Sequence, residues 1–201
     1  VTPNAYEESW DVVSGADANR VNGTTADNSF GYVSPSMSGV TLHASYYTPS
    51  SGNASTYQDF GIKMSPEMVE GLEVGYAFGT SEATAGTEID ESTMYVKYAV
   101  GAVTIGYQTS DYDAPTAAAS NDSTMMGISY AVSDAFSVAY NQSEFDIGGA
   151  ADDQKSTGIS ASYTMGGITV AGAMNSTDNI AGSTATTADK DAYEMSISFA
   201  F

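Results

Sequence analysis

The sequence predicts an all-β protein, a transmembrane antiparallel up-and-down β-barrel. Three observations support this prediction. Bulky apolar side chains alternate with small or polar ones over most of the chain, short and long connections follow one another in turn, and the last alternating segment is the most hydrophobic. Within lipid, every backbone polar group must be satisfied inside the protein, so strands cross a membrane only as closed barrels.

The last segment, residues 193–201, shows the alternation most clearly. Its polar face carries Glu194 and two serines, whereas its apolar face consists of Tyr193, Met195, Ile197, Phe199 and Phe201. The alternative is a half-buried strand of a soluble sandwich. Soluble proteins seldom end on an apolar edge strand, however, because such edges aggregate and termini fray. The segment therefore favours a strand with one face in lipid.

Composition narrows the class of protein. The chain has 201 residues, of which 42% are hydrophobic and only 15% are charged. Five Lys and Arg residues stand against 25 Asp and Glu, a net charge of −20, which argues against a nucleic-acid partner and leaves room for cations. The absence of Cys excludes disulfides and thiolate metal sites. No apolar run approaches the roughly 18 residues of a membrane helix, which does not exclude membrane strands.

Residues 1–27 lack sustained alternation and predict a long ordered loop, whereas residues 28–201 carry the strands. Most of the alternating segments match the 9–11 residues or so that a lipid-crossing strand needs. About eleven strands are expected, at residues 28–34, 39–47, 57–65, 70–79, 91–100, 101–110, 122–132, 134–144, 155–165, 167–176 and 190–201.

Each of these segments has one bulky apolar face and one face of small or polar residues. The small face suits a water-filled lumen, because a soluble core would need bulk from both sides. The apolar face is expected to meet lipid or a neighbouring subunit, with Tyr and Phe gathered at the two membrane interfaces. Residues predicted on this face include Val74, Tyr76, Ile105, Tyr107, Val138, Tyr140, Ile197 and Phe199.

The connections alternate in length. Short turns are predicted near residues 34–39, 65–71, 100–101, 133–134 and 165–167, with long polar loops between them. Short turns at one end and long loops at the other are typical of a meander in an outer membrane, with the short turns on the periplasmic side. A sandwich with Greek-key crossovers gives no such alternation.

With this pattern, the chain resembles a general diffusion porin of the outer membrane, of the sixteen-stranded alphaproteobacterial (Rhodobacter-type) family. The resemblance rests on the acidic segment NAYEESWD, the polar stretch after it and the strand NSFGYVSP, which look like the inward-folded constriction loop and the strand that follows. It implies that residues 1–27 are a constriction-type loop and that the chain is the C-terminal two-thirds of a porin. Eleven antiparallel strands would close with a parallel pair, so an odd number of strands, five by resemblance, is expected before Val1.

Catalytic motifs are missing, and no enzyme activity is expected. His43 is the only His, and nothing resembles GxSxG, HExxH or a phosphate-binding loop. No cofactor is expected to be required. The pairs Asp111 with Asp113 and Asp152 with Asp153 are placed in long loops and lack the frame of a calcium loop, which favours solvated charge. The resemblance nevertheless implies Ca²⁺ bound by acidic loops, which could also share divalent cations with lipopolysaccharide.

The expected pore constriction combines acidic residues from the loop with basic residues from the wall. Glu7, Glu8 and Asp11 are the densest acidic cluster outside the long outer loops, and they lie in the segment that resembles the constriction loop. The parity of the strands points His43, Lys63 and Lys97 into the lumen. A Lys facing lipid would cost roughly 2–4 kcal/mol at the midplane. The alternative for these three residues is that their side chains are solvated in the lumen without a role in the constriction.

The resemblance implies a passive outer-membrane pore for small hydrophilic solutes and ions, and a trimer. A preference for cations is expected from the acidic residues of the constriction and from the small number of basic residues in the chain. One alternative is a surface adhesion or binding barrel whose acidic extracellular loops carry the function. Another is a secreted soluble β protein. Detergent dependence separates the soluble protein from the two barrels, and single-channel conductance separates the pore from the adhesin.

Overall fold

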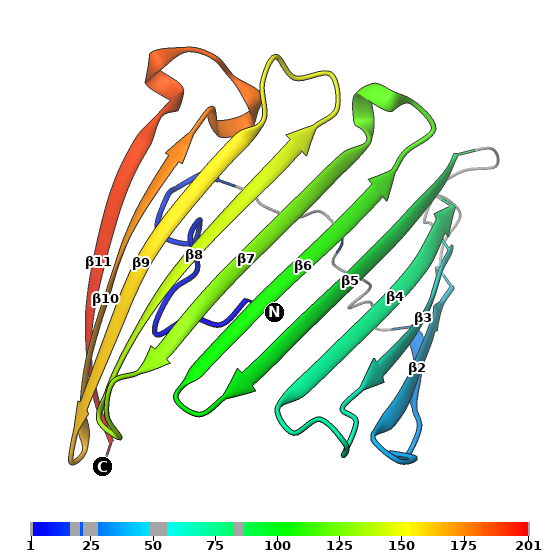
Figure 1. The fold of residues 1–201 in the computed structure, drawn as a ribbon. Coiled ribbons are helices and arrows are strands. Elements are labelled where there is room, and N and C mark those ends of the chain that lie inside the picture. Colours follow the sequence, from blue (N-terminus) through cyan, green and yellow to red (C-terminus); the bar gives the residue numbers. More distant parts are fainter. Residues whose placement is uncertain (1, 17–20, 22–27, 49–55, 83–86, 201) are drawn as a thin grey trace.

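The alternating segments form one antiparallel sheet in the computed structural model, which describes residues 2–16, 21, 28–48, 56–82 and 87–200 (Figure 1). Each strand pairs with its neighbours in sequence. The strands are β1 (Ser29–Val33), β2 (Val40–Tyr47), β3 (Thr56–Met64), β4 (Leu72–Glu82), β5 (Glu88–Val100), β6 (Val103–Asp113), β7 (Asn121–Ala131), β8 (Phe136–Ile147), β9 (Gln154–Met165), β10 (Ile168–Asp178) and β11 (Lys190–Phe199). The predicted antiparallel up-and-down meander is confirmed. Phe201, the predicted terminal aromatic, lies outside the described residues.

The connections at one end of the sheet are shorter on average than those at the other end (Figure 1). The β3–β4 connection, residues 65–71, is an exception, since it is longer than the β4–β5 and β8–β9 connections at the opposite end. The 3₁₀-helices η1 (Ala117–Ala119), η2 (Ile180–Gly182) and η3 (Thr186–Ala188) belong to the longer connections. Glycine is required in the turn before β4, because Gly71 has a φ of +82° and a Cβ there would lie 2.0 Å from the carbonyl oxygen of Ala99. Among the described residues, no helix is long and apolar enough to span a bilayer.

Several strands extend further toward the long connections than the sequence predicts. β6 ends at Asp113, so Asp111 and Asp113 lie on a strand and not in a loop. The backbone ladder continues there, with Asp111 opposite Ser92 on β5 and opposite Asp122 on β7. Above the lipid the outward face can be polar, so the alternation fades although the pairing does not. Asp152 and Asp153 do lie in a loop, between β8 and β9.

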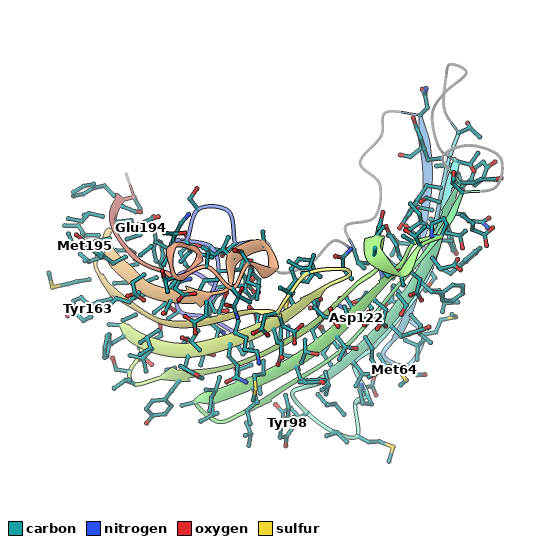
Figure 2. All side chains as sticks on the ribbon, turned by 90° about the horizontal axis from the view of Figure 1, so that it is seen from above. Met64, Tyr98, Asp122, Tyr163, Glu194 and Met195 are labelled. Carbon is teal, nitrogen blue, oxygen red and sulfur yellow. The ribbon has the colours of Figure 1, made fainter. Side chains whose placement is uncertain are left out.

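The sheet is curved, and its convex face carries the large apolar side chains, among them Met64, Tyr98, Tyr163 and Met195 (Figure 2). All eight side chains predicted to face lipid lie on this face, by the register of the strands. Tyr98 and Tyr163 lie near the short turns, as does Tyr130, in the manner of an interfacial aromatic girdle.

The concave face is lined by small and polar residues, as predicted, but part of it is covered by the protein itself. Asn141 and Thr177 are 0% exposed and Gln154 is 1% exposed. The β10–β11 connection contributes to this cover, since the amide of Ala181 donates to Oε1 of Gln154 at 3.1 Å. The alternation predicts a water-filled lumen along this whole face. The structure differs from this prediction. Part of the concave face is covered by segments of the chain that pack against its small and polar residues.

Candidate pore-lining site

The N-terminal segment, residues 2–16, lies on the concave side of the sheet at mid-height (Figures 1 and 2). It contains no strand and is held by side chains that project from the wall. Asn141 on β8 donates from Nδ2 to the carbonyl oxygen of Pro3 at 2.7 Å, and the amide of Ala5 donates to Oγ of Ser160 on β9 at 3.2 Å. Inward polar residues of the strands therefore satisfy the backbone of this segment.

The segment also approaches the wall very closely. A Cβ at Gly158 on β9 would lie 2.7 Å from Cα of Ser9, and Ser9 is 0% exposed. Nearby, Nδ2 of Asn175 on β10 donates to the carbonyl oxygen of Glu8. Sequence reasoning missed these anchors. Glycine and asparagine at inward positions were the sequence signal that could have indicated a packed segment. A wall that faces only water does not require these residues there.

Glu7, Glu8 and Asp11 are brought together by a turn within the segment. The amide of Glu8 donates to Oδ2 of Asp11 at 3.1 Å, and Oγ1 of Thr2 donates to Oε1 of Glu8 at 2.8 Å. Burial raises the pKa of Glu7, and the hydrogen bond and charge of Asp11 raise it further. Burial also raises the pKa of Glu8. The sequence-predicted acidic cluster is thus a compact group of interacting carboxylates.

Glu194 is a fourth carboxylate of this group and was not among the predicted site residues. It projects inward from β11 and accepts a hydrogen bond from the hydroxyl of Tyr6. Its charge also contributes to the raised pKa of Glu7. The signal was present in the sequence, because period-two alternation puts Glu194 on the polar face of the last strand. We define the acidic cluster as Glu7, Glu8, Asp11 and Glu194.

The two predicted lysines lie on a different part of the wall, on β3 and β5. Nζ of Lys63 is 3.1 Å from Oε2 of Glu73, and Nζ of Lys97 is 3.4 Å from Oε1 of the same carboxylate. Tyr95 donates its hydroxyl proton to Oε1 of Glu73 at 3.0 Å. Glu73 on β4, which sequence reasoning missed, therefore holds both lysines in one network.

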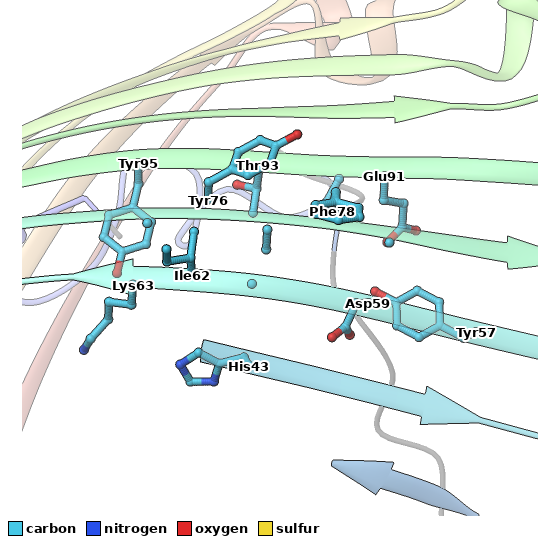
Figure 3. A pocket seen from close by; sticks show the side chains of 15 residues that line it. His43, Tyr57, Asp59, Ile62, Lys63, Tyr76, Phe78, Glu91, Thr93 and Tyr95 are labelled. Atoms are coloured by element: carbon cyan, nitrogen blue, oxygen red, sulfur yellow. The ribbon is translucent and has the colours of Figure 1, made fainter. Parts of the chain in front are cut away.

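His43 lines a depression of about 430 Å³ in the concave face of β2 to β5, together with Lys63 (Figure 3). The floor of this depression is made of glycine and alanine. Its polar lining consists of His43, Tyr57, Asp59, Lys63, Glu91, Thr93 and Tyr95. Among the described residues, no group of three or more His, Asp or Glu side chains is arranged to hold a metal ion.

A model of the Gram-negative porin family matches residues 2–182. The chain belongs to this family. No curated protein matches the chain. The family assignment confirms the resemblance inferred from the sequence, and it makes the protein a non-enzymatic channel of the bacterial outer membrane.

Solved porin structures share the fold at low sequence identity. A porin refined at 1.8 Å resolution aligns with a TM-score of 0.73 and 16% identity, over 100% of this chain and 73% of that one. A mutant of Rh. blastica porin aligns with a TM-score of 0.60 and 20% identity, over 98% and 66%. OmpT of Vibrio cholerae, expressed in the outer membrane, aligns with a TM-score of 0.60 and 15% identity, over 98% and 75%.

Proposed function

We propose that this porin forms a water-filled channel for the passive diffusion of small hydrophilic solutes and ions, with a preference for cations. The observation that carries the proposal is the acidic cluster on the concave face of β8 to β11, where residues 2–16 supply Glu7, Glu8 and Asp11 and β11 supplies Glu194. Its carboxylates lie where a segment narrows the lumen, so ions that pass must approach them. Pores lined by carboxylates favour cations.

The opposite side of the proposed constriction is formed by His43, Lys63 and Lys97. Glu73 offsets one of the two lysine charges, which leaves a net charge of +1 from two ammonium groups and one carboxylate. The four carboxylates of the acidic cluster outweigh this charge. Lys190, at the start of β11, donates to the carbonyl oxygen of Ser14 at 3.3 Å. We infer a transverse field that is dominated by its acidic side.

Reversal potentials under a salt gradient test the cation preference. Neutralising Glu7→Gln, Glu8→Gln and Asp11→Asn together should lower the permeability ratio of cations over anions. The matched control changes Asp111, Asp122 and Asp146 to Asn, because these carboxylates face outward and their removal alters the net charge equally. An unchanged reversal potential in the triple variant would contradict the assignment. A purified protein without any single-channel conductance would overturn the pore itself and favour the adhesion alternative.

The proposal includes a closed barrel and a homotrimer. β1 and β11 are the edges of the described sheet, and an unpaired edge would leave backbone groups unsatisfied in lipid. Closed symmetric assemblies are the usual form of homo-oligomers, and the family resemblance favours three subunits. The molecular mass of the purified protein in detergent, corrected for bound detergent, tests this; a monomer mass would exclude the trimer.

We also propose that acidic outer loops bind Ca²⁺. Asp152 and Asp153 are adjacent, and burial together with the charges of Asp146 and Glu144 raises the pKa of Asp153. A cation would relieve this repulsion. Calcium should therefore raise the thermal midpoint of the porin, and the increase should shrink in a variant with Asp152→Asn and Asp153→Asn. An equal response of both proteins would rule out this loop.

A further inference from the structure

The depression on β2 to β5 carries opposite charges at its two ends. Asp59 and Lys63 both face inward on β3, four residues apart, which is about 13 Å along a strand. Glu91 on β5 lies at the same end as Asp59, toward the long connections, and Lys63 lies toward the short turns (Figure 3). The wall of the lumen therefore presents a dipole that runs along the pore axis.

The acidic end lacks a cation among the described residues. In the described part of the chain, Lys63 and Lys97 pair with Glu73 and Lys155 pairs with Glu144. None of these ion pairs involves Asp59 or Glu91. Asp59 accepts a hydrogen bond from Oγ of Ser45 at 2.6 Å, and Oε2 of Glu91 is buried without a hydrogen-bond partner.

Tyr57 interacts with both of these carboxylates. A phenol carries only one proton, however, so it cannot donate to Asp59 and Glu91 at once. Buried acceptors of this kind are normally satisfied. An ammonium group fits this end, because it supplies both a positive charge and three donors.

The other end suits a carboxylate. Two lysines share Glu73, so one positive charge is in excess, and the side chain of Lys63 is 46% exposed to the lumen. Lys63 can therefore receive a second carboxylate without first leaving its partner. His43 lines the same depression and can add a ring N–H donor.

The floor between the two ends is open. A Cβ at Gly61 would find its nearest neighbour, Cβ of Ala77, at 3.4 Å, so small residues make up the wall in the middle. Val21 also lines the depression. Tyr57 and Tyr95 lie over Gly79 and Gly75, where a Cβ would clash with their side chains. The two rings therefore border a flat floor of small residues. A volume of about 430 Å³ lies within the range of small-molecule sites.

We propose that this depression binds short peptides and similar zwitterions whose ammonium and carboxylate groups lie several bonds apart. The ammonium group lies against Asp59 and Glu91, and the carboxylate group lies against Lys63. A free amino acid cannot span the two ends, because only one carbon separates its charges. The inference rests on the proposed pore function to the extent that the solute reaches the lumen by diffusion.

Trialanine in single-channel recordings of the full-length porin tests the proposal. The free tripeptide should reduce the ion current saturably. N-acetylated trialanine and free alanine should do so at least about tenfold more weakly, given the strength of charged hydrogen bonds. Glu91→Gln should raise the half-saturating tripeptide concentration by a similar factor. Asp90→Asn is the matched control, since Asp90 neighbours Glu91 on β5 but faces outward.

The outcomes distinguish failure of the proposed binding site from failure of the proposed pore. Normal conductance in salt with no saturable tripeptide effect overturns the binding site and leaves the pore intact. Equal block by the N-acetylated peptide, or an unchanged half-saturation in Glu91→Gln, also overturns it. Absence of conductance in the unaltered protein defeats the proposed pore function instead. Conductance of each variant in salt alone verifies that it has folded and inserted.

Discussion

Lys63 on β3 and Glu73 on β4 form an ion pair in the lumen wall, with 3.1 Å between Nζ and Oε2. Lys97 approaches the same carboxylate from β5, directly opposite Glu73 in the strand register. One carboxylate thus links three strands and keeps two like charges close together. The pair is partly exposed, so its contribution to stability is small, about 1 kcal/mol or less. Its larger effect is on the field in the pore.

We expect Glu73→Gln to reduce cation selectivity with little loss of stability. The substitution removes one negative charge from the wall and leaves both lysines uncompensated, which repels cations. The reversal potential in a salt gradient should shift toward that of an anion-preferring pore. Glu144→Gln is the control, because Glu144 also pairs with a lysine, Lys155, but faces outward. A shift of equal size in the control would exclude a lumenal cause.

The acidic cluster predicts a pH dependence of selectivity. The pKa values of Glu7 and Glu8 are raised, so both carboxyls bind protons before ordinary carboxyls as the pH falls from neutrality. Ordinary carboxyl groups titrate at about pH 4 to 5. As the pH falls, cation preference should therefore begin to decline above that range. A raised folded-state pKa also means that packing of this segment is more stable below that pKa and less stable above it.

Reversal potentials measured over a pH series check this expectation. A variant with Glu7→Gln and Glu8→Gln should lack the early decline, because it lacks the two carboxyls whose pKa values are raised. If the variant and the unaltered porin follow the same curve, the titrating groups lie elsewhere in the pore.

The close approach of Ser9 to Gly158 predicts that even a methyl group at Gly158 will displace the N-terminal segment, residues 2–16. Gly158→Ala puts Cβ 2.7 Å from Cα of Ser9, and an overpacked contact of this kind typically costs about 1–3 kcal/mol. The segment should move off the wall, which changes single-channel conductance and increases its fluctuations. Gly31→Ala is the control, since a Cβ there meets nothing within 4 Å. Identical conductance of the two variants would show that the segment does not narrow the pore.

The strands could be predicted from the sequence because lipid imposes a strict pattern on one face. Bulky residues such as Tyr76 and Ile105 must recur every second position wherever a strand crosses hydrocarbon. The same rule fails above the membrane. Asp111 and Asp113 remain on β6 without any apolar alternation, so the sequence placed them in a loop.

The site was harder to predict because it depends on contacts between distant parts of the chain. Parity placed Lys63 and Lys97 inward, but the sequence could not show that Glu73 binds both of them. Acidic residues drew attention to the N-terminal segment, residues 2–16, in the sequence, whereas its anchors on the wall, such as Asn141, gave only a weak signal. Inward polar residues are equally compatible with a wall that faces water and with a wall that binds a loop. Only the three-dimensional structure distinguishes these two cases.

The final prediction concerns the convex face. Ile128 lies on the outward face of β7 and is 43% exposed, between Ile105 and Tyr140 on the adjacent strands. If this face meets lipid, Ile128→Arg should reduce the free energy of unfolding by about 2–4 kcal/mol, because the guanidinium is driven into hydrocarbon. Thr104→Arg on the inward face of β6 is the matched control and should cost much less, because its charge remains in water. Urea titrations of both variants folded into lipid vesicles measure the difference, and equal losses would mean that the convex face does not lie in the membrane.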